Sequence, residues 1–243
     1  MLVKSIIAMY VVMPAVAVLM AYVLDLPERT ELALVILAIC AGAPLLPKKL
    51  IKFGGDPSFV FSLIVNTSLL AIVTVPASLH LLAGTISLDT PTVTPAHVAG
   101  VILKTFLLPL GTGMLLRWVA PTLAERIGEP LLKIASIVMG ICAIVALAAG
   151  FHLVFEVGLP SVLAFAAFTL AAILAGHFLG GPDPSDRTSL AIACASRHIG
   201  LALLIAANAR DQHALALVVA YLLASAVVSI PYVLWLRKRR KRE

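Results

Sequence analysis

The chain has 243 residues, of which 61% are hydrophobic and 12% are charged, and its mean hydropathy is +1.08. A water-soluble domain of this length could not bury so many apolar side chains, so the composition excludes one. It predicts an all-α polytopic membrane protein. The net charge of +6 indicates no nucleic-acid partner, because its source is the basic run 237–242, which follows an apolar segment and suits a tail on anionic lipid.

Apolar segments long enough to cross a bilayer as helices recur along the chain. Together they predict about eight transmembrane helices in a single membrane domain that covers residues 1–243. With the N-terminus cytoplasmic, 14 of the 18 Lys and Arg residues lie on the cytoplasmic side, as is typical of membrane proteins. We therefore expect both termini to be cytoplasmic. The expected spans are residues 3–24, 30–47, 58–82, 96–118, 131–151, 158–180, 189–208 and 212–236.

Two parts of the sequence repeat each other in outline. Residues 37–43 resemble residues 190–196, with one inserted residue. These segments lie in the second and seventh spans, which cross the bilayer in opposite directions, so the pattern predicts an inverted-topology repeat. Three pairs of landmarks keep a nearly constant offset: Cys40 and Cys194 (154 residues), Asp56 and Asp211 (155 residues), and Pro76 and Pro231 (155 residues).

Both repeated spans carry residues that interrupt a helix near the middle of the span. We therefore expect two broken helices that cross near the midplane, where transporters built from inverted repeats bind their substrates. The interrupting residues are Gly42, Pro44 and Pro47 in the second span, and Ser196, Arg197, His198 and Gly200 in the seventh.

Arg197 is a charge in a place where a membrane disfavours one. A helix that starts near residue 189 puts it roughly 12–15 Å deep, in a hydrocarbon core about 30 Å thick, at a cost of about 2.5 kcal/mol or more. In one interpretation its planar guanidinium pairs with a substrate carboxylate or sulfonate. In the other it bonds backbone carbonyls that the helix break leaves free. His198 beside it either titrates during transport or packs as a structural residue.

Polar residues also lie in the middle of the third span (residues 66–68) and of the last (Ser225 and Ser229), although Ser and Thr often bond only to their own helix. Lys104 either lines an access path or snorkels to the surface. All twelve Asp and Glu residues fall in loops, termini or span edges, so no buried carboxylate can run a proton relay. The predicted substrate-binding residues are Gly42, Ala43, Pro44, Asn66, Thr67, Ser196, Arg197 and His198, with no catalytic residue and no metal site.

In the run from Cys40 to Asp56, and again around residues 196–202, the sequence resembles the bile acid:sodium symporter family. It is similar to a short variant that lacks the family's first two helices. The resemblance implies a bacterial inner-membrane protein with a core of two inverted units beside a panel, and a homodimer could supply the missing panel helices. The implied parts are core units 1–82 and 158–236, a reduced panel 96–151 and a basic cytoplasmic tail 237–243.

Members of that family carry small organic anions, usually with sodium, so the resemblance implies an organic-anion carrier that works by alternating access. The family's usual sodium ligands are absent, however. Leu46 and Pro47 stand where the family has a Ser-Asn pair. Ala193 and Arg197 stand where it has a glutamate and a glutamine. We therefore expect no cofactor, leave sodium coupling open, and expect Arg197 to be a fixed positive charge in the midplane site.

Two other functions stay open. Related arsenite exporters use a membrane cysteine, and Cys40 and Cys194 could bind a soft metalloid through their sulfur atoms. A non-transporting membrane scaffold derived from the same family is the second alternative. An enzyme is not expected, because the sequence contains no Gly-x-Ser-x-Gly elbow, no paired aspartates and no His-Glu-x-x-His motif.

Overall fold

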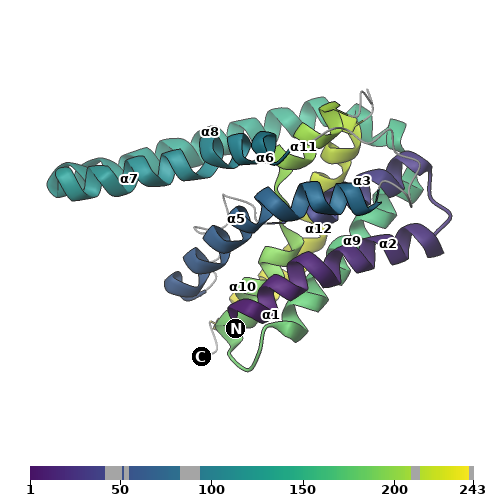
Figure 1. The fold of residues 1–243 in the computed structure, drawn as a ribbon, viewed down its shortest axis with the longest axis horizontal. Helices are drawn as coiled ribbons and strands as arrows, with labels where there is room; N and C mark the ends of the chain where they lie inside the picture. The colour runs from purple at the N-terminus through teal and green to yellow at the C-terminus, as the bar shows by residue number, and fades with distance from the viewer. Residues whose placement is uncertain (42–50, 52–54, 83–93, 209–213, 241–243) are drawn as a thin grey trace.

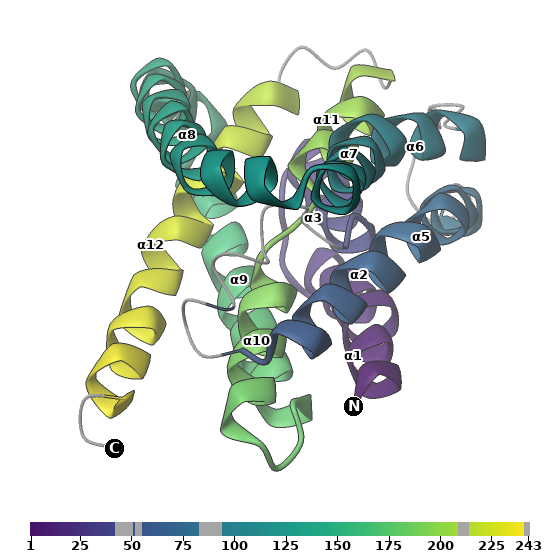
Figure 2. The ribbon, with the colours of Figure 1, turned by 90° about the vertical axis from the view of Figure 1, so that its left-hand side faces the viewer.

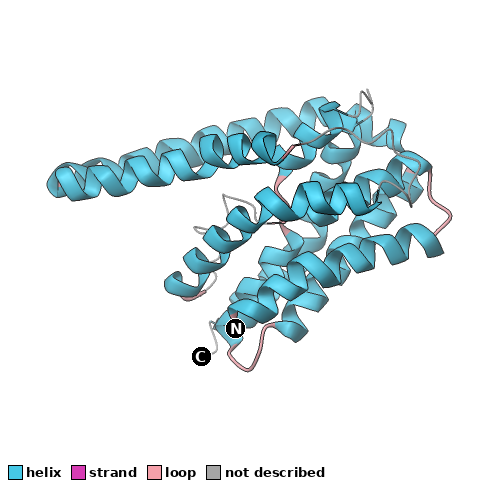
Figure 3. Cartoon of the chain, viewed as in Figure 1, coloured by secondary structure: helices cyan, strands magenta, loops and turns pink. Residues whose placement is uncertain are grey.

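The computed structural model describes residues 1–41, 51, 55–82, 94–208 and 214–240, and every regular element in these parts is a helix (Figure 3). The all-α prediction is therefore confirmed. Within the described residues, five helical runs are long and apolar enough to cross a membrane, and they correspond to the first, third, fourth, sixth and eighth predicted spans. These runs are Leu2–Val23, Pro57–Leu81, Pro95–Val119, Leu159–Leu179 and Ala216–Leu236.

Two of these spans contain a single π-helical turn, and each turn ends two residues before a proline, Pro14 or Pro109. A proline cannot donate a backbone hydrogen bond, and its ring crowds the carbonyl four residues earlier. A π turn widens the backbone locally and so accommodates the ring. The first span consists of α1 (Leu2–Ile7), η1 (Ala8–Val12) and α2 (Met13–Val23), and the fourth of α6 (Pro95–Ile102), η2 (Leu103–Leu107) and α7 (Leu108–Val119).

In both repeated spans a helix ends inside the predicted span. Helix α3 (Glu28–Ile39) ends three residues before Gly42, the first residue expected to break it, and Cys40 already has a non-helical backbone. Gly42, Ala43 and Pro44 lie outside the described residues. In the seventh span, α10 (Pro184–Ala195) and α11 (Ile199–Asn208) are separated by the three expected residues, 196–198.

Helix α8 (Pro121–Val157) differs from the prediction of a loop after residue 118 and a span at residues 131–151. It is one helix of 37 residues, and only Ala120 separates it from α7. Proline at the first helical position needs no donor, and residues 122–129 are rich in helix-forming side chains. At 1.5 Å per residue α8 is about 55 Å long, so it is far longer than a bilayer core is thick. Figure 1 shows α7 and part of α8 projecting beyond the other helices.

Helix α9 (Leu159–Leu179) lies at the centre of the remaining helices, and it packs against α10, against α12 (Ala214–Arg240) and against the first span (Figure 2). Its side chains Phe165 and Phe168 are fully buried. Helix α5 (Pro57–Leu82) packs against α6 and α1, while α8 lies along α12. The division into core units 1–82 and 158–236 beside a panel, and the inverted relation of the two repeats, stay predictions.

The close packing of α9 on α10 requires glycine at two positions. A Cβ atom on Gly176 would lie 2.5 Å from the Cα of Ala191, and one on Gly180 would lie 2.4 Å from the Cα of Arg187. Both distances are far shorter than any ordinary contact between non-bonded carbons. The two glycines therefore set how deeply α10, and with it the second helix break, sits against α9.

We expect Gly176→Ala to destabilise the protein by about 1–3 kcal/mol, because an added methyl group forces two backbones apart. Thermal unfolding in detergent measures this as a lower midpoint temperature. Gly111→Ala is the matched control, because a Cβ there meets nothing within 4 Å and alanine favours a helix over glycine. Equal unfolding temperatures for the two variants would show that the α9–α10 contact is not as tight as described.

Candidate anion site at the helix crossing

The two helix breaks meet and are joined by a backbone hydrogen bond. The N–H group of His198 donates to the carbonyl oxygen of Cys40 at 2.9 Å, and α11 packs against α3. Interrupted helices leave backbone donors and acceptors without their usual partners, and in a membrane these groups must be satisfied inside the protein. This bond satisfies one group from each break and fixes where the two chain segments cross.

Arg197 lies in the second break and is 2% exposed. Its Nη1 atom donates to the carbonyl oxygen of Ala38, in the last turn of α3, at 3.3 Å. Its guanidinium carbon lies 5.3 Å from the centre of the Phe168 ring, a distance at which a cation is attracted to an aromatic face. Nε and Nη2 are buried and have no hydrogen-bond partner among the described residues. The guanidinium therefore makes one structural hydrogen bond and keeps two donors unpaired.

His198 caps the helix that follows it. Its Nδ1 atom accepts a hydrogen bond from the backbone N–H of Leu201 at 3.2 Å, so the proton of the neutral ring lies on Nε2. Nε2 is buried and has no partner in the described part of the chain. This arrangement agrees with the interpretation of His198 as a structural residue.

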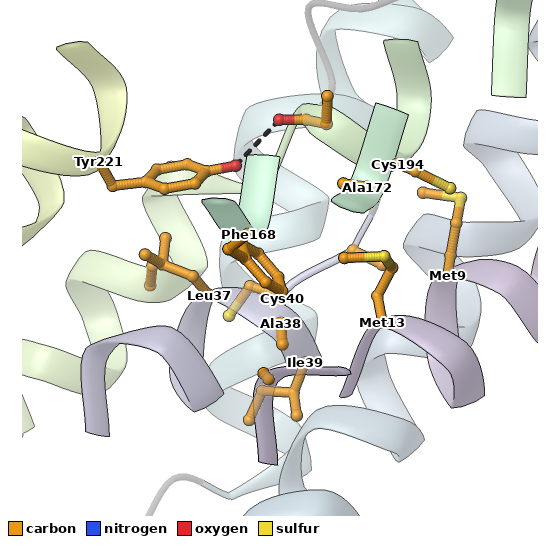
Figure 4. Close-up of a cluster of buried hydrophobic side chains, with 14 of the residues drawn as sticks. Met9, Met13, Leu37, Ala38, Ile39, Cys40, Phe168, Ala172, Cys194 and Tyr221 are labelled. Carbon is orange, nitrogen blue, oxygen red and sulfur yellow. Dashed lines mark hydrogen bonds between the residues drawn. The ribbon is translucent and has the colours of Figure 1, made fainter. Parts of the chain in front are cut away.

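Tyr221, on α12, completes the second break. Its hydroxyl group donates to the carbonyl oxygen of Ala195, the last residue of α10, at 2.9 Å. The same hydroxyl lies near the guanidinium of Arg197, but neither Nε nor Nη2 is aligned with it for a hydrogen bond. Its ring meets the edge of Phe165 with centroids 6.0 Å apart. Figure 4 shows this hydrogen bond, with Phe168 between Tyr221 and the first-break residue Cys40. The sequence alone did not identify Phe168 or Tyr221 as site residues. The only signal for Tyr221 was a hydroxyl group inside an apolar span.

A cavity of about 540 Å³ lies between the second break and α12. Among the described residues, Arg197 is the only charged one in its lining, and Tyr221, Ser225 and Ser229 contribute hydroxyl groups from one face of α12. The rest of the lining is almost entirely apolar. Such a cavity fits a ligand with one charged end and an apolar body. The described lining residues are Ala195, Ser196, Arg197, Ile199, Tyr221, Leu222, Ser225, Ala226, Ser229, Ile230, Val233 and Leu234.

Three predicted site residues, Asn66, Thr67 and His198, do not line this cavity. Asn66 donates to the carbonyl of Ser62 at 2.7 Å, and Thr67 donates to that of Leu63 at 2.8 Å, so both bond within their own helix α5. The carbonyl of Thr67 in turn accepts from the Tyr10 hydroxyl, which ties α5 to the first span. Of the predicted residues that the structure describes, Ser196, Arg197 and His198 alone lie at the crossing.

The remaining candidates lie apart from the cavity. Lys104 is exposed on η2. Cys40 and Cys194 are both fully buried, and their thiols are free. Buried cysteine commonly packs as a small apolar residue. Neither cysteine lines the cavity, so the metalloid alternative stays a prediction.

Long apolar helices, two helix breaks that meet and a cavity beside the second break are together typical of a multi-pass helical membrane protein of the transporter type. The sequence model of the sodium bile acid symporter family matches residues 1–156, more than half of the chain, and the protein belongs to that family. No curated protein matches the chain. Members of this family are transporters, which supports the expectation that the protein is not an enzyme. The match ends before the second break, so Arg197 and the cavity lie outside it.

We expect Tyr221→Phe to lower stability by about 1–2 kcal/mol, because it leaves the buried carbonyl of Ala195 without its donor. A thermal unfolding series in detergent measures the change. Tyr22→Phe is the control, because Tyr22 is 90% exposed and loses no buried hydrogen bond. If both variants unfold with the wild type, the Tyr221 hydroxyl group does not hold the second break.

Proposed function

We propose that the protein is a secondary carrier of small organic anions in which Arg197 provides the fixed positive charge for the substrate. One observation carries this proposal: a guanidinium that is 2% exposed keeps Nε and Nη2 unpaired among the described residues. Unpaired donors on a buried charge are costly. An anionic substrate would supply the missing acceptors and the opposite charge together.

The proposal includes transport that does not need sodium, although the family is described as sodium-coupled. The C-terminal end of a helix carries partial negative charge and attracts cations. At the end of α3, Nη1 of Arg197 already donates to the Ala38 carbonyl. A tethered cation therefore lies where a free one would be attracted, and it remains there throughout the transport cycle.

Alternating access accounts for a binding group that is closed off. Nε and Nη2 are buried, whereas the cavity that Arg197 lines extends along α12 from Tyr221 to Leu234. If the C-terminus is cytoplasmic, as the charge distribution predicts, this cavity belongs to the inward-facing side. A substrate would reach the guanidinium when α10 and α11 move relative to α12, with α6–α8 as the reduced panel.

The test measures binding of carboxylates, keto acids and aryl sulfonates to the purified protein. The readout is the rise in unfolding temperature that each compound causes, with and without sodium. We expect at least one carboxylate to stabilise the wild type equally in both conditions and to have no effect on Arg197→Gln. The control is Arg117→Gln, which removes an exposed arginine on α7 and should behave as the wild type does. Unliganded melting curves establish that each variant is folded.

Stabilisation that persists in Arg197→Gln and requires sodium would overturn the proposal and favour a sodium-coupled carrier. No stabilisation by any anion, with folded wild-type protein, would favour the scaffold or metalloid alternatives.

A further inference from the structure

We propose that Phe168 is a positioning residue that fixes the guanidinium of Arg197 so that only its Nε–Nη2 edge meets the substrate, and that the site thereby selects a carboxylate over a sulfonate on the same carbon skeleton. This inference rests on the proposed function and narrows it to one head-group chemistry. It concerns α9, a helix that does not line the cavity.

The hydrogen bond that Arg197 makes leaves one edge of its guanidinium free. A guanidinium presents two forks, the side edge formed by Nε and Nη2 and the end edge formed by Nη1 and Nη2. Nη1 is committed to the Ala38 carbonyl, so the end edge is not free. Nε and Nη2, the two atoms without partners in the described residues, are the pair whose N–H bonds lie parallel in the side edge. The unpaired donors of Arg197 therefore form a fork for two oxygen atoms.

Phe168 restricts how this fork can turn. Its ring is fully buried, and its centre lies 5.3 Å from the guanidinium carbon. Contact with an aromatic face opposes rotation of the guanidinium, and the hydrogen bond to Ala38 holds the plane at another point. Two supports from two helices, α9 and α3, determine the direction in which the free edge points.

The number of donors favours a carboxylate. Its two oxygen atoms match the two donors of the side edge, and both lie in the plane of the guanidinium. A sulfonate has a third oxygen, which would lose its water without gaining a partner from this edge. The desolvated third oxygen makes transfer of a sulfonate into the site less favourable than transfer of a carboxylate on the same skeleton.

The experiment compares three naphthalene probes of one skeleton: the 2-carboxylate, the 2-sulfonate and the neutral 2-carboxamide. Isothermal titration of the intact protein in detergent gives their dissociation constants. We expect the wild type to bind the carboxylate about tenfold more tightly than the sulfonate, and not to bind the carboxamide. We expect Phe168→Leu to reduce that ratio by about tenfold, because the guanidinium is no longer held by a ring.

Phe165→Leu is the matched control. Phe165 is one turn away on the same helix, equally buried, and contacts Tyr221 in place of the guanidinium. A purely structural loss would weaken binding of both anions in either variant and leave the ratio unchanged. Arg197→Lys keeps the charge without the fork, so we expect a ratio near one. This second variant keeps the test decisive if Phe168→Leu does not fold.

The outcomes separate the two proposals. Equal affinity of the wild type for carboxylate and sulfonate, with both lost in Arg197→Gln, would overturn the selectivity and leave the anion carrier intact. An unchanged ratio in folded Phe168→Leu would overturn the role of Phe168. Failure of both anions to bind folded wild-type protein would overturn both the carrier and this inference.

Discussion

A guanidinium buried where two interrupted helices meet is the constraint on which the rest of this structure depends. Breaking a helix inside a membrane frees backbone carbonyls, and placing a charge there requires acceptors. The two requirements partly satisfy each other, because the charged Arg197 donates to the Ala38 carbonyl at the end of α3. The breaks, the charge and the contact between α3 and α11 therefore form one unit. A change that removed only one of them would leave the others unsatisfied.

Outside this unit, close backbone contact at two glycines of α9 holds the crossing in place. Helix α9 meets α10 at Gly176 and Gly180, where there is no room for a Cβ atom. Nearer its N-terminus α9 presents Phe165 to Tyr221 on α12. Since Tyr221 also bonds the last carbonyl of α10, the position of the second break is determined from two sides. Association by close approach of small residues suits helices in lipid, where apolar burial gives no driving force.

The sequence predicted the five spans found among the described residues, and the second break, because both have strong local signals. Hydropathy identifies long apolar runs. Three consecutive polar residues, 196–198, inside such a run indicate a break in the helix. The start of α8 was missed because hydropathy falls at Glu125 and Arg126 whereas helix propensity does not. Phe168 was missed for a different reason. In an apolar helix it resembles any core residue, and its contact with Arg197 depends on which face of α9 turns towards the crossing, a tertiary property.

The π turn in the first span has a geometric consequence for that helix. One extra residue in a turn rotates everything after it by about 100° relative to a regular helix. The side chains after η1 therefore point in directions, relative to those before it, that differ from their directions in a regular helix of the same sequence. The span uses this freedom, since α1 packs against α5 whereas α2 packs against α3. A single rod thus contacts different neighbours in its two halves, and Tyr10, inside the turn, reaches the α5 backbone from the point where the helix changes face.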